Sequence, residues 1–225
     1  MNIRFLEPAQ AELDDAIASR AEPRCALSDT VLETLPAIGA PDSTSPMHPH
    51  PILHFWFTEL SPKQHFAKDP ALDEAIRTRF GATLEAAVRC ELFAWRATPQ
   101  GRLAEVVVLD QFSRNVYRDT ARAFAQDALA LALAQEQVAS GQDRSLPLAQ
   151  RSFAYMPYMH SESALVHTQA VALFSQPGLE DSLRSALRHK AIIDRFGRYP
   201  HRNAALGRNS TPQELAFLRE PGSSF

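Results

Sequence analysis

From Pro51 onward, apolar residues recur at helical spacing, and the breaks between apolar stretches carry the signals of helix starts. Three of these breaks place an N-cap side chain directly before a proline, which suits the first helical position because its missing N–H is not needed there. They are Asp69–Pro70, Thr98–Pro99 and Thr211–Pro212. In the third, Glu214 completes a capping box. The pattern therefore predicts helices that begin at these three prolines.

Helix ends are marked as well. The segment ARAFAQDALALALAQEQVASG stops at Gly141, and GLEDSLRSALRHKAIIDRFG opens with two acids and closes with basic residues before Gly197. The β-branched run in EVVVLDQF (105–112) lies in a segment begun by a helix cap, so we interpret it as a buried helix. No window alternates apolar and polar residues between two turns. The sequence predicts an all-α fold of roughly eight helices stacked as antiparallel pairs, because the connecting loops are short.

Residues 1–50 differ from the rest of the chain. Segments 11–20 and 28–35 could form short amphipathic helices, but five prolines follow between Pro36 and Pro51, which is linker composition. The first fifty residues are either a disordered extension or an arm that docks on the main body, and we favour the extension. We expect residues 51–225 to form a single helical domain.

Composition and charge narrow the functional classes. The chain has 225 residues, of which 45% are hydrophobic, enough to bury a core. The net charge of −3 and a pI near 6.2 provide no global basic field, so we do not expect a nucleic-acid partner. No stretch suits a signal peptide or a membrane span, and Cys25 and Cys90 lack the spacing of a redox pair. We expect a soluble cytoplasmic protein; the sequence does not indicate its oligomeric state.

The first polar cluster is LDQFSRN, residues 109–115. Asp110 and Arg114 are four residues apart on one helical face, with the acid before the base, which is the favourable order for an ion pair. The apolar run before Asp110 indicates a buried carboxylate, which must pair with a cation or shift its pKa upward. The pair is either a structural salt bridge, which we favour, or part of a functional site.

The second cluster is YMPYMHSE, residues 155–162, in which Pro157 ends or kinks a helix. His160 and Glu162 follow at the junction before the next helix, whose dipole would stabilise the Glu162 anion. These two residues and His167 could supply metal ligands, but no ligand-spacing motif supports a metal site, so we expect none. Capping and hydrogen bonding are simpler roles for them.

The third cluster, RFGRYPHRNAALGR at 195–208, places four arginines, a histidine and an asparagine around two glycines. Arginine forks bind carboxylates and phosphates bidentately, so several in one rigid loop can clamp an anion. The same arginines can instead bind Asp110 and Glu162, which would join the three clusters into one internal network. Burial decides between these alternatives. We expect the three clusters to meet in space.

Four motifs in this order carry a resemblance to a known family: ILHFWF, LDQFSRNVYRDT, FAYMPYMHSE and HKAIIDRFGRYPHRNAALGRNSTPQELAFL. They resemble a bacterial domain-of-unknown-function family, numbered nine-two-four, whose members look like tetratricopeptide-type helical folds. The match covers about residues 51–220. It implies an all-α bundle of stacked helix pairs and no established activity. The chain departs from the family pattern at four places: His65, Ser113, Val166–His167 and Tyr199.

Two functions fit these observations. The first is a non-catalytic helical-repeat scaffold, in which a groove between helix pairs receives a peptide, a partner protein or a small ligand. We rank it slightly ahead, because the implied fold favours binding and no motif indicates a particular reaction.

The alternative is an enzyme of hydrolase or transferase type that acts on a small anionic substrate. Arginines would hold the substrate anion, a histidine would transfer a proton, and a carboxylate would orient the histidine. The candidate catalytic residues are Asp110, His160, Glu162 and His201. The candidate ligand-binding residues are Gln111, Arg114, Asn115, Arg198, Arg202, Asn203 and Arg208. No nucleophile elbow, phosphate-binding glycine loop or metal signature appears, and we expect no cofactor.

Overall fold

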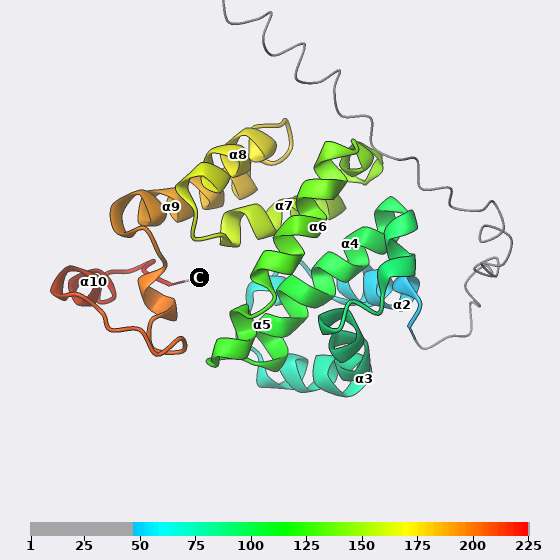
Figure 1. Ribbon diagram of the computed structural model, residues 1–225, viewed down its shortest axis with the longest axis horizontal. Coiled ribbons are helices and arrows are strands. Elements are labelled where there is room, and N and C mark those ends of the chain that lie inside the picture. The colour runs from blue at the N-terminus through cyan, green and yellow to red at the C-terminus, as the bar shows by residue number, and fades with distance from the viewer. Residues whose placement is uncertain (1–46, 225) are drawn as a thin grey trace, which may run out of the picture. The chain divides into compact units, whose positions relative to one another are not determined.

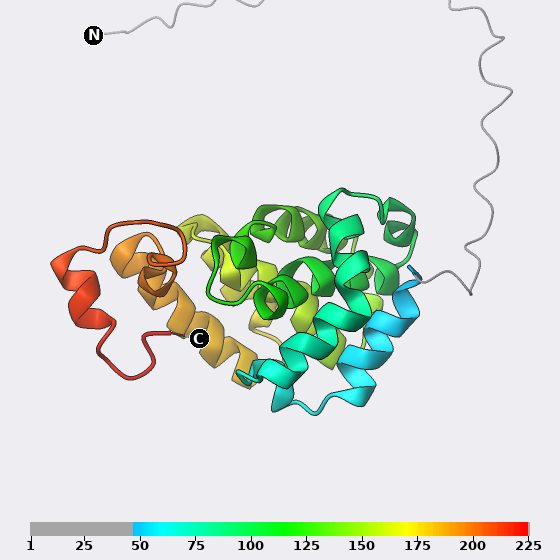
Figure 2. The ribbon, with the colours of Figure 1, turned by 90° about the horizontal axis from the view of Figure 1, so that it is seen from below.

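The computed structural model describes residues 47–224, so nearly all of the N-terminal extension and linker predicted for residues 1–50 lies outside the described residues. The described residues form helices joined by turns, without a strand among them (Figures 1 and 2). The α-helices are α2 (Pro49–His54), α3 (Pro70–Val88), α4 (Pro99–Val107), α5 (Ser113–Val116), α6 (Asp127–Ala139), α7 (Leu148–His160), α8 (Ala164–Phe174), α9 (Glu180–Phe196) and α10 (Pro212–Phe217). The all-α prediction is confirmed for this part of the chain.

The predicted helix caps are present. Asp69 and Thr98 accept hydrogen bonds from the backbone N–H groups of Ala71 and Gly101, and Thr211 forms the capping box with Glu214. Two further predictions concern helix ends, where the residue just past the helix adopts the left-handed conformation that glycine tolerates. Gly141 follows α6 with φ 70°, and Gly197 follows α9 with φ 68°. Local sequence therefore sets where these helices begin and end.

The EVVVLDQF segment is helical and buried, as predicted, but its second half is not α-helical. α4 continues into a π-helical turn over Val108–Phe112, and α5 follows directly. Single π-helical turns within α-helices are frequent at functional sites. This one carries Asp110, which is only 1% exposed.

α7 runs through Pro157 and ends at His160. The sequence predicted that Pro157 either ends or kinks a helix, and the structure excludes the first alternative. The helix therefore carries His160 as its last residue, followed directly by the junction that leads to α8. A rigid helix end holds this side chain more firmly than a loop would.

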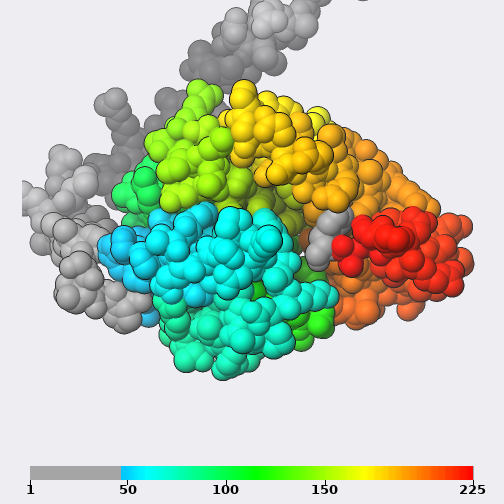
Figure 3. Space-filling model, turned by 180° about the vertical axis from the view of Figure 1, so that it is seen from behind, coloured from blue at the N-terminus to red at the C-terminus, as the bar shows by residue number. Residues whose placement is uncertain are grey.

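Neighbouring helices pack in sequence order, with α6 on α7, α7 on α8 and α8 on α9, while α2 and α6 both pack on α4 (Figures 1 and 2). The space-filling view shows the C-terminal segment at one end of the described part, beside α9 (Figure 3). None of the described helices is long and apolar enough to cross a membrane. The tetratricopeptide-like arrangement and the cytoplasmic location stay predictions.

The apolar core has two parts. The larger extends from α2 to α9, and the smaller holds Ile192, Ile193, Tyr199 and Phe217 near the C-terminus. Tyr199 links them, because its hydroxyl donates a hydrogen bond of 2.5 Å to the backbone carbonyl of Met159 in the larger core. The polar residues singled out in the sequence gather beside this link.

Candidate functional site

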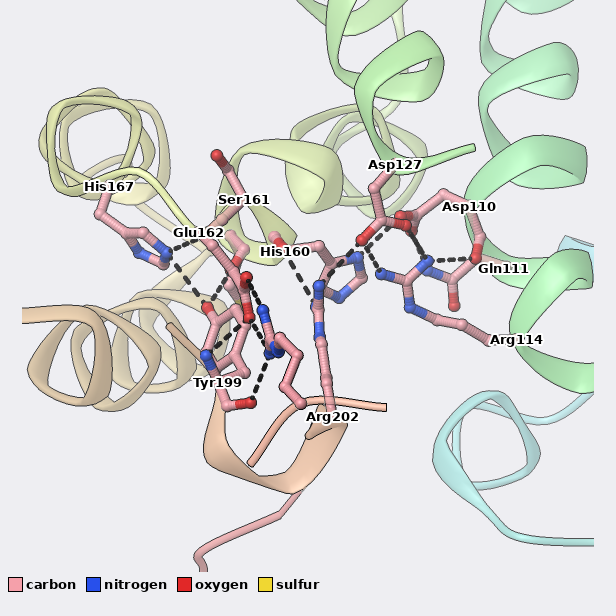
Figure 4. Close-up of polar contacts among 12 residues, drawn as sticks. Asp110, Gln111, Arg114, Asp127, His160, Ser161, Glu162, His167, Tyr199 and Arg202 are labelled. Atoms are coloured by element: carbon pink, nitrogen blue, oxygen red, sulfur yellow. Dashed lines mark hydrogen bonds and ion pairs between the residues drawn. The ribbon is translucent and has the colours of Figure 1, made fainter. Parts of the chain in front are cut away.

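Asp110 and His160 form a hydrogen-bonded pair at the centre of the site (Figure 4). Asp110 Oδ1 lies 2.8 Å from His160 Nδ1 and 3.0 Å from Arg114 Nη1, so the predicted Asp110–Arg114 ion pair is confirmed. Gln111 donates from Nε2 to Asp110 Oδ2 at 2.5 Å. The helix end and the π-helical turn thus bring together residues fifty positions apart, and both oxygens of a buried carboxylate have partners.

A second carboxylate, that of Asp127 at the start of α6, lies between two arginines. Arg114 Nη2 and Arg202 Nη1 each donate to Asp127 Oδ2 at 3.0 Å. Arg202 also donates from Nη2 to the backbone carbonyl of His160 at 3.0 Å, so the first and third polar clusters both reach the second. We call this set the His160 cluster; it comprises Asp110, Gln111, Arg114, Asp127, His160 and Arg202.

The protonation states in the cluster follow from burial and charge. Burial would raise the pKa of the Asp110 carboxyl, but Arg114 and His160 outweigh burial and hold that pKa well below its usual range. Burial lowers the pKa of the His160 imidazole, although Asp110 opposes this shift. At neutral pH, Asp110 is therefore an anion beside a neutral imidazole, whose Nδ1–H donates to it. Within the described residues, Nε2 of His160 makes no hydrogen bond.

Glu162 anchors the arginine-rich loop to the junction after α7. Arg208 donates from Nη1 and Nη2 to the Glu162 carboxylate at 2.6 and 2.9 Å, and the backbone N–H of Tyr199 donates to it at 2.7 Å. Arg208 Nε also donates to Asn203 Oδ1 at 3.0 Å. Burial would raise the pKa of Glu162, but these bonds outweigh burial and lower it. Glu162, Asn203 and Arg208 thus fix the loop rather than join the His160 cluster.

Three histidine rings pack on the buried ring of Tyr199. The centroids of His167, His189 and His201 lie 6.2, 5.8 and 5.4 Å from its centroid. Tyr199 and His167, two positions at which this chain departs from the pattern of the resembling family, also contact each other through Tyr199 Oη and His167 Nε2, 3.1 Å apart. Burial lowers the pKa of His201 to about 4. His160, the other candidate proton-transfer residue, is paired with the Asp110 carboxylate.

Two more candidate ligand-binding residues, besides Asn203 and Arg208, lie outside the His160 cluster. Arg198 donates from Nε and Nη2 to the carboxylate of Glu214 at 2.7 and 2.9 Å. Asn115 donates to Asp73 at 2.8 Å. Both side chains already bind carboxylates of the protein itself.

Two of the hollows on the surface of the described part are large enough to hold a ligand. The first, about 470 Å³, is mainly apolar and lies between α6, α7 and α8; its lining residues are Gln135, Val138, Ala139, Tyr158, Gln169, Ala172 and Leu173. The second, about 500 Å³, includes Arg195, Arg198 and Glu214. Neither is lined by a residue of the His160 cluster. Among the described residues, no group of three or more His, Cys, Asp or Glu side chains is placed to hold a metal ion.

Residues 52–222 match the model of a family described as bacterial proteins of unknown function, DUF924. The chain belongs to this family. The solved structure of a protein of unknown function from Agrobacterium tumefaciens is 37% identical, with a TM-score of 0.73 over 76% of this chain and 96% of that one. No curated protein matches the chain. The assignment predicted from four motifs is confirmed. Because the family is described only as being of unknown function, the activity of this DUF924 protein has to be argued from its site.

Sequence reasoning missed two residues of this DUF924 protein that contact the arginines. Asp127 binds both Arg114 and Arg202, and the Phe124 ring lies under both guanidinium groups, 5.7 and 4.6 Å from its centroid. Asp127 lies inside the segment 121–141 that the sequence predicted as helical, and the structure begins α6 at this residue. An acid in the first turn of a helix indicates only a favourable interaction with the helix dipole. No sequence pattern indicated that Phe124 would contact the arginines.

Proposed function

We propose that this DUF924 protein acts on a small anionic substrate at the His160 cluster, as a hydrolase or transferase in which Nε2 of His160 transfers a proton. The observation that carries the proposal is the Asp110–His160 pair. A buried carboxylate binds Nδ1, which directs the lone pair of Nε2 away from the carboxylate. A neutral imidazole held in one tautomer by a carboxylate is an effective general base near neutral pH.

The arginines of the cluster supply the reason for an anionic substrate. Arg114 and Arg202 lie on either side of the Asp127 carboxylate, close to His160. Guanidinium groups bind carboxylates and phosphates bidentately and stabilise charge that develops on a substrate oxygen. The side chains of His160 and Arg114 are 15% and 20% exposed, so the cluster is not sealed.

The same contacts also hold the fold together, which is the structural-lock alternative for these residues. Asp110, Asp127, Arg114 and Arg202 are paired with one another, and these pairs join α5, α6 and the loop after α9. His160 adds the end of α7 through its contacts with Asp110 and Arg202. A purely structural role accounts for every contact in the cluster, but it gives Nε2 of His160 no part. For this reason we now rank the enzyme ahead of the scaffold.

A comparison of wild type with His160→Gln tests the proposal. Both proteins are assayed against phosphate monoesters, carboxylic esters and amides, with the exposed His50→Gln as a matched control. Loss of a general base lowers kcat/KM by about 10²–10⁴-fold, so His160→Gln should lose turnover that His50→Gln retains. A substrate-independent check is the imidazole ¹⁵N spectrum, which should show the Nδ1–H tautomer at His160. Turnover by His160→Gln equal to wild type would refute the assignment.

A second candidate is a binding function in the apolar hollow between α6, α7 and α8, into which an apolar side chain of a peptide partner would fit. Its volume and apolar lining support this alternative. Ala172→Arg would fill the hollow and should abolish partner binding without changing any turnover that depends on His160.

A further inference from the structure

Asp127 differs from the other carboxylate of the cluster in its surroundings. Its side chain is 19% exposed, whereas that of Asp110 is 1% exposed. Asp127 Oδ1 lies 2.9 Å from Arg114 Nη1. Asp127 Oδ2 lies 3.0 Å from both Arg114 Nη2 and Arg202 Nη1. A carboxylate or phosphate group of a bound ligand would use the same geometry toward two guanidinium groups. Asp127 thus contacts both guanidinium groups as an anionic ligand would.

One short segment covers both arginines. The 3₁₀ turn Ala121–Phe124 places the Phe124 ring under the two guanidinium groups, and Asp127 follows three residues later at the start of α6. The residue before α6 provides no side-chain cap, and Asp119, at the start of the segment, has φ 61°. Ring and carboxylate would move together if this segment shifted.

We infer that Asp127 is the internal occupant of an anion subsite formed by Arg114 and Arg202, and that a substrate carboxylate or phosphate binds by replacing it. This inference rests on the proposed function in one respect, since it names the group that the substrate anion displaces. The cluster contains two carboxylates and two guanidinium groups, so exchanging Asp127 for a ligand carboxylate keeps the charges balanced. Arg202, which is 6% exposed, would not be left unpaired.

The inference predicts weak anion binding by the wild-type protein. A ligand that binds only when Asp127 has left has its affinity reduced by the fraction of molecules in that state. Asp127→Asn removes the competing charge, so it should bind inorganic phosphate about tenfold or more tightly than wild type. Replacing Arg202 with Gln in the same variant should abolish the gain.

The experiment measures the dissociation constant of inorganic phosphate, with acetate as the carboxylate probe, by calorimetry at constant ionic strength. The matched control is Asp194→Asn, which removes the same charge from an exposed carboxylate paired with Lys190. If Asp127→Asn fails to fold, Phe124→Ala takes its place, because it loosens the cover over both arginines and leaves every charge unchanged.

Tighter phosphate binding by Asp127→Asn than by Asp194→Asn, lost on adding Arg202→Gln, supports the inference. The inference is overturned if Asp127→Asn binds phosphate no more tightly than Asp194→Asn, or if the tighter binding persists when Arg202→Gln is added. Where Phe124→Ala replaces Asp127→Asn, it is overturned if Phe124→Ala binds phosphate no more tightly than wild type. The readout does not require turnover, so His160→Gln in the Asp127→Asn background should keep the gain. Tighter anion binding by Asp127→Asn without any turnover that depends on His160 would refute the proposed function alone. Turnover that depends on His160 without tighter anion binding by Asp127→Asn would refute the displacement of Asp127 alone.

Discussion

His189 should make the stability of this protein strongly dependent on pH. The imidazole lies on α9, is 6% exposed, and donates from Nδ1 to the Ser185 carbonyl at 2.8 Å. Its ring centroid lies 6.3 Å from that of His160 and 5.8 Å from that of Tyr199. Burial, with a smaller effect from His160, lowers its pKa to about 3. Folding thus holds His189 neutral where the unfolded chain would protonate it.

The sign of the effect follows from proton linkage. In the unfolded chain a histidine has a pKa of about 6.5, so below that pH the unfolded state binds a proton that the folded state does not. The contribution of His189 is fully present above pH 6.5 and is lost as the pH falls from 6.5 toward 3. Below pH 6.5 the free energy of unfolding falls by about 1.4 kcal/mol per pH unit, which gives about 2 kcal/mol between pH 7.5 and 5.0.

The assay is urea unfolding of wild type and His189→Gln at pH 7.5 and 5.0. The glutamine amide can still donate to the Ser185 carbonyl but does not titrate. Between pH 7.5 and 5.0, the free energy of unfolding of the variant should therefore fall by about 2 kcal/mol less than that of wild type. In thermal melts the same difference corresponds to about 4–8 °C for a domain of this size. The exposed His50→Gln serves as the control and should follow wild type. Identical pH dependence in wild type and His189→Gln would contradict the reasoning.

Two further predictions concern stability. Glu105 is 0% exposed and receives two hydrogen bonds from Arg96, at 2.7 and 2.6 Å, so Arg96→Ala leaves a buried carboxylate unpaired and should cost about 3–5 kcal/mol in denaturant unfolding. Arg89→Ala, which breaks an exposed pair, should cost at most about 1 kcal/mol; equal costs would refute the role of burial. Tyr199→Phe removes the hydroxyl that donates to the Met159 carbonyl and should cost about 1–3 kcal/mol, whereas an unchanged unfolding midpoint would show that this bond is not needed.

The site was partly predictable from sequence. The Asp110–Arg114 pair followed from i,i+4 spacing on one helix, and the structure contains it. The convergence of the first and second clusters was expected, and His160 does reach Asp110 from fifty residues away. The role of each arginine could not be predicted, because a guanidinium accepts any carboxylate within reach and the sequence offered several.

Several helix boundaries were determined by the sequence alone. The caps at Asp69, Thr98 and Thr211 and the left-handed glycines at 141 and 197 act within a few residues of the chain, so their effect does not depend on distant packing. The all-α class and the family membership are consequences of the same local patterns and motifs.

Only the tertiary structure decided which carboxylate each arginine binds. Arg198 binds Glu214, Arg208 binds Glu162, and Arg202 binds Asp127, which is 75 residues away in the chain. These partners are selected by the packing of α6, α7 and α9, which places charges within about 3 Å, the distance over which ion pairs become strong. Packing likewise buries Asp110 and leaves Nε2 of His160 without a hydrogen bond in the described residues, because both properties depend on helices that are distant in sequence.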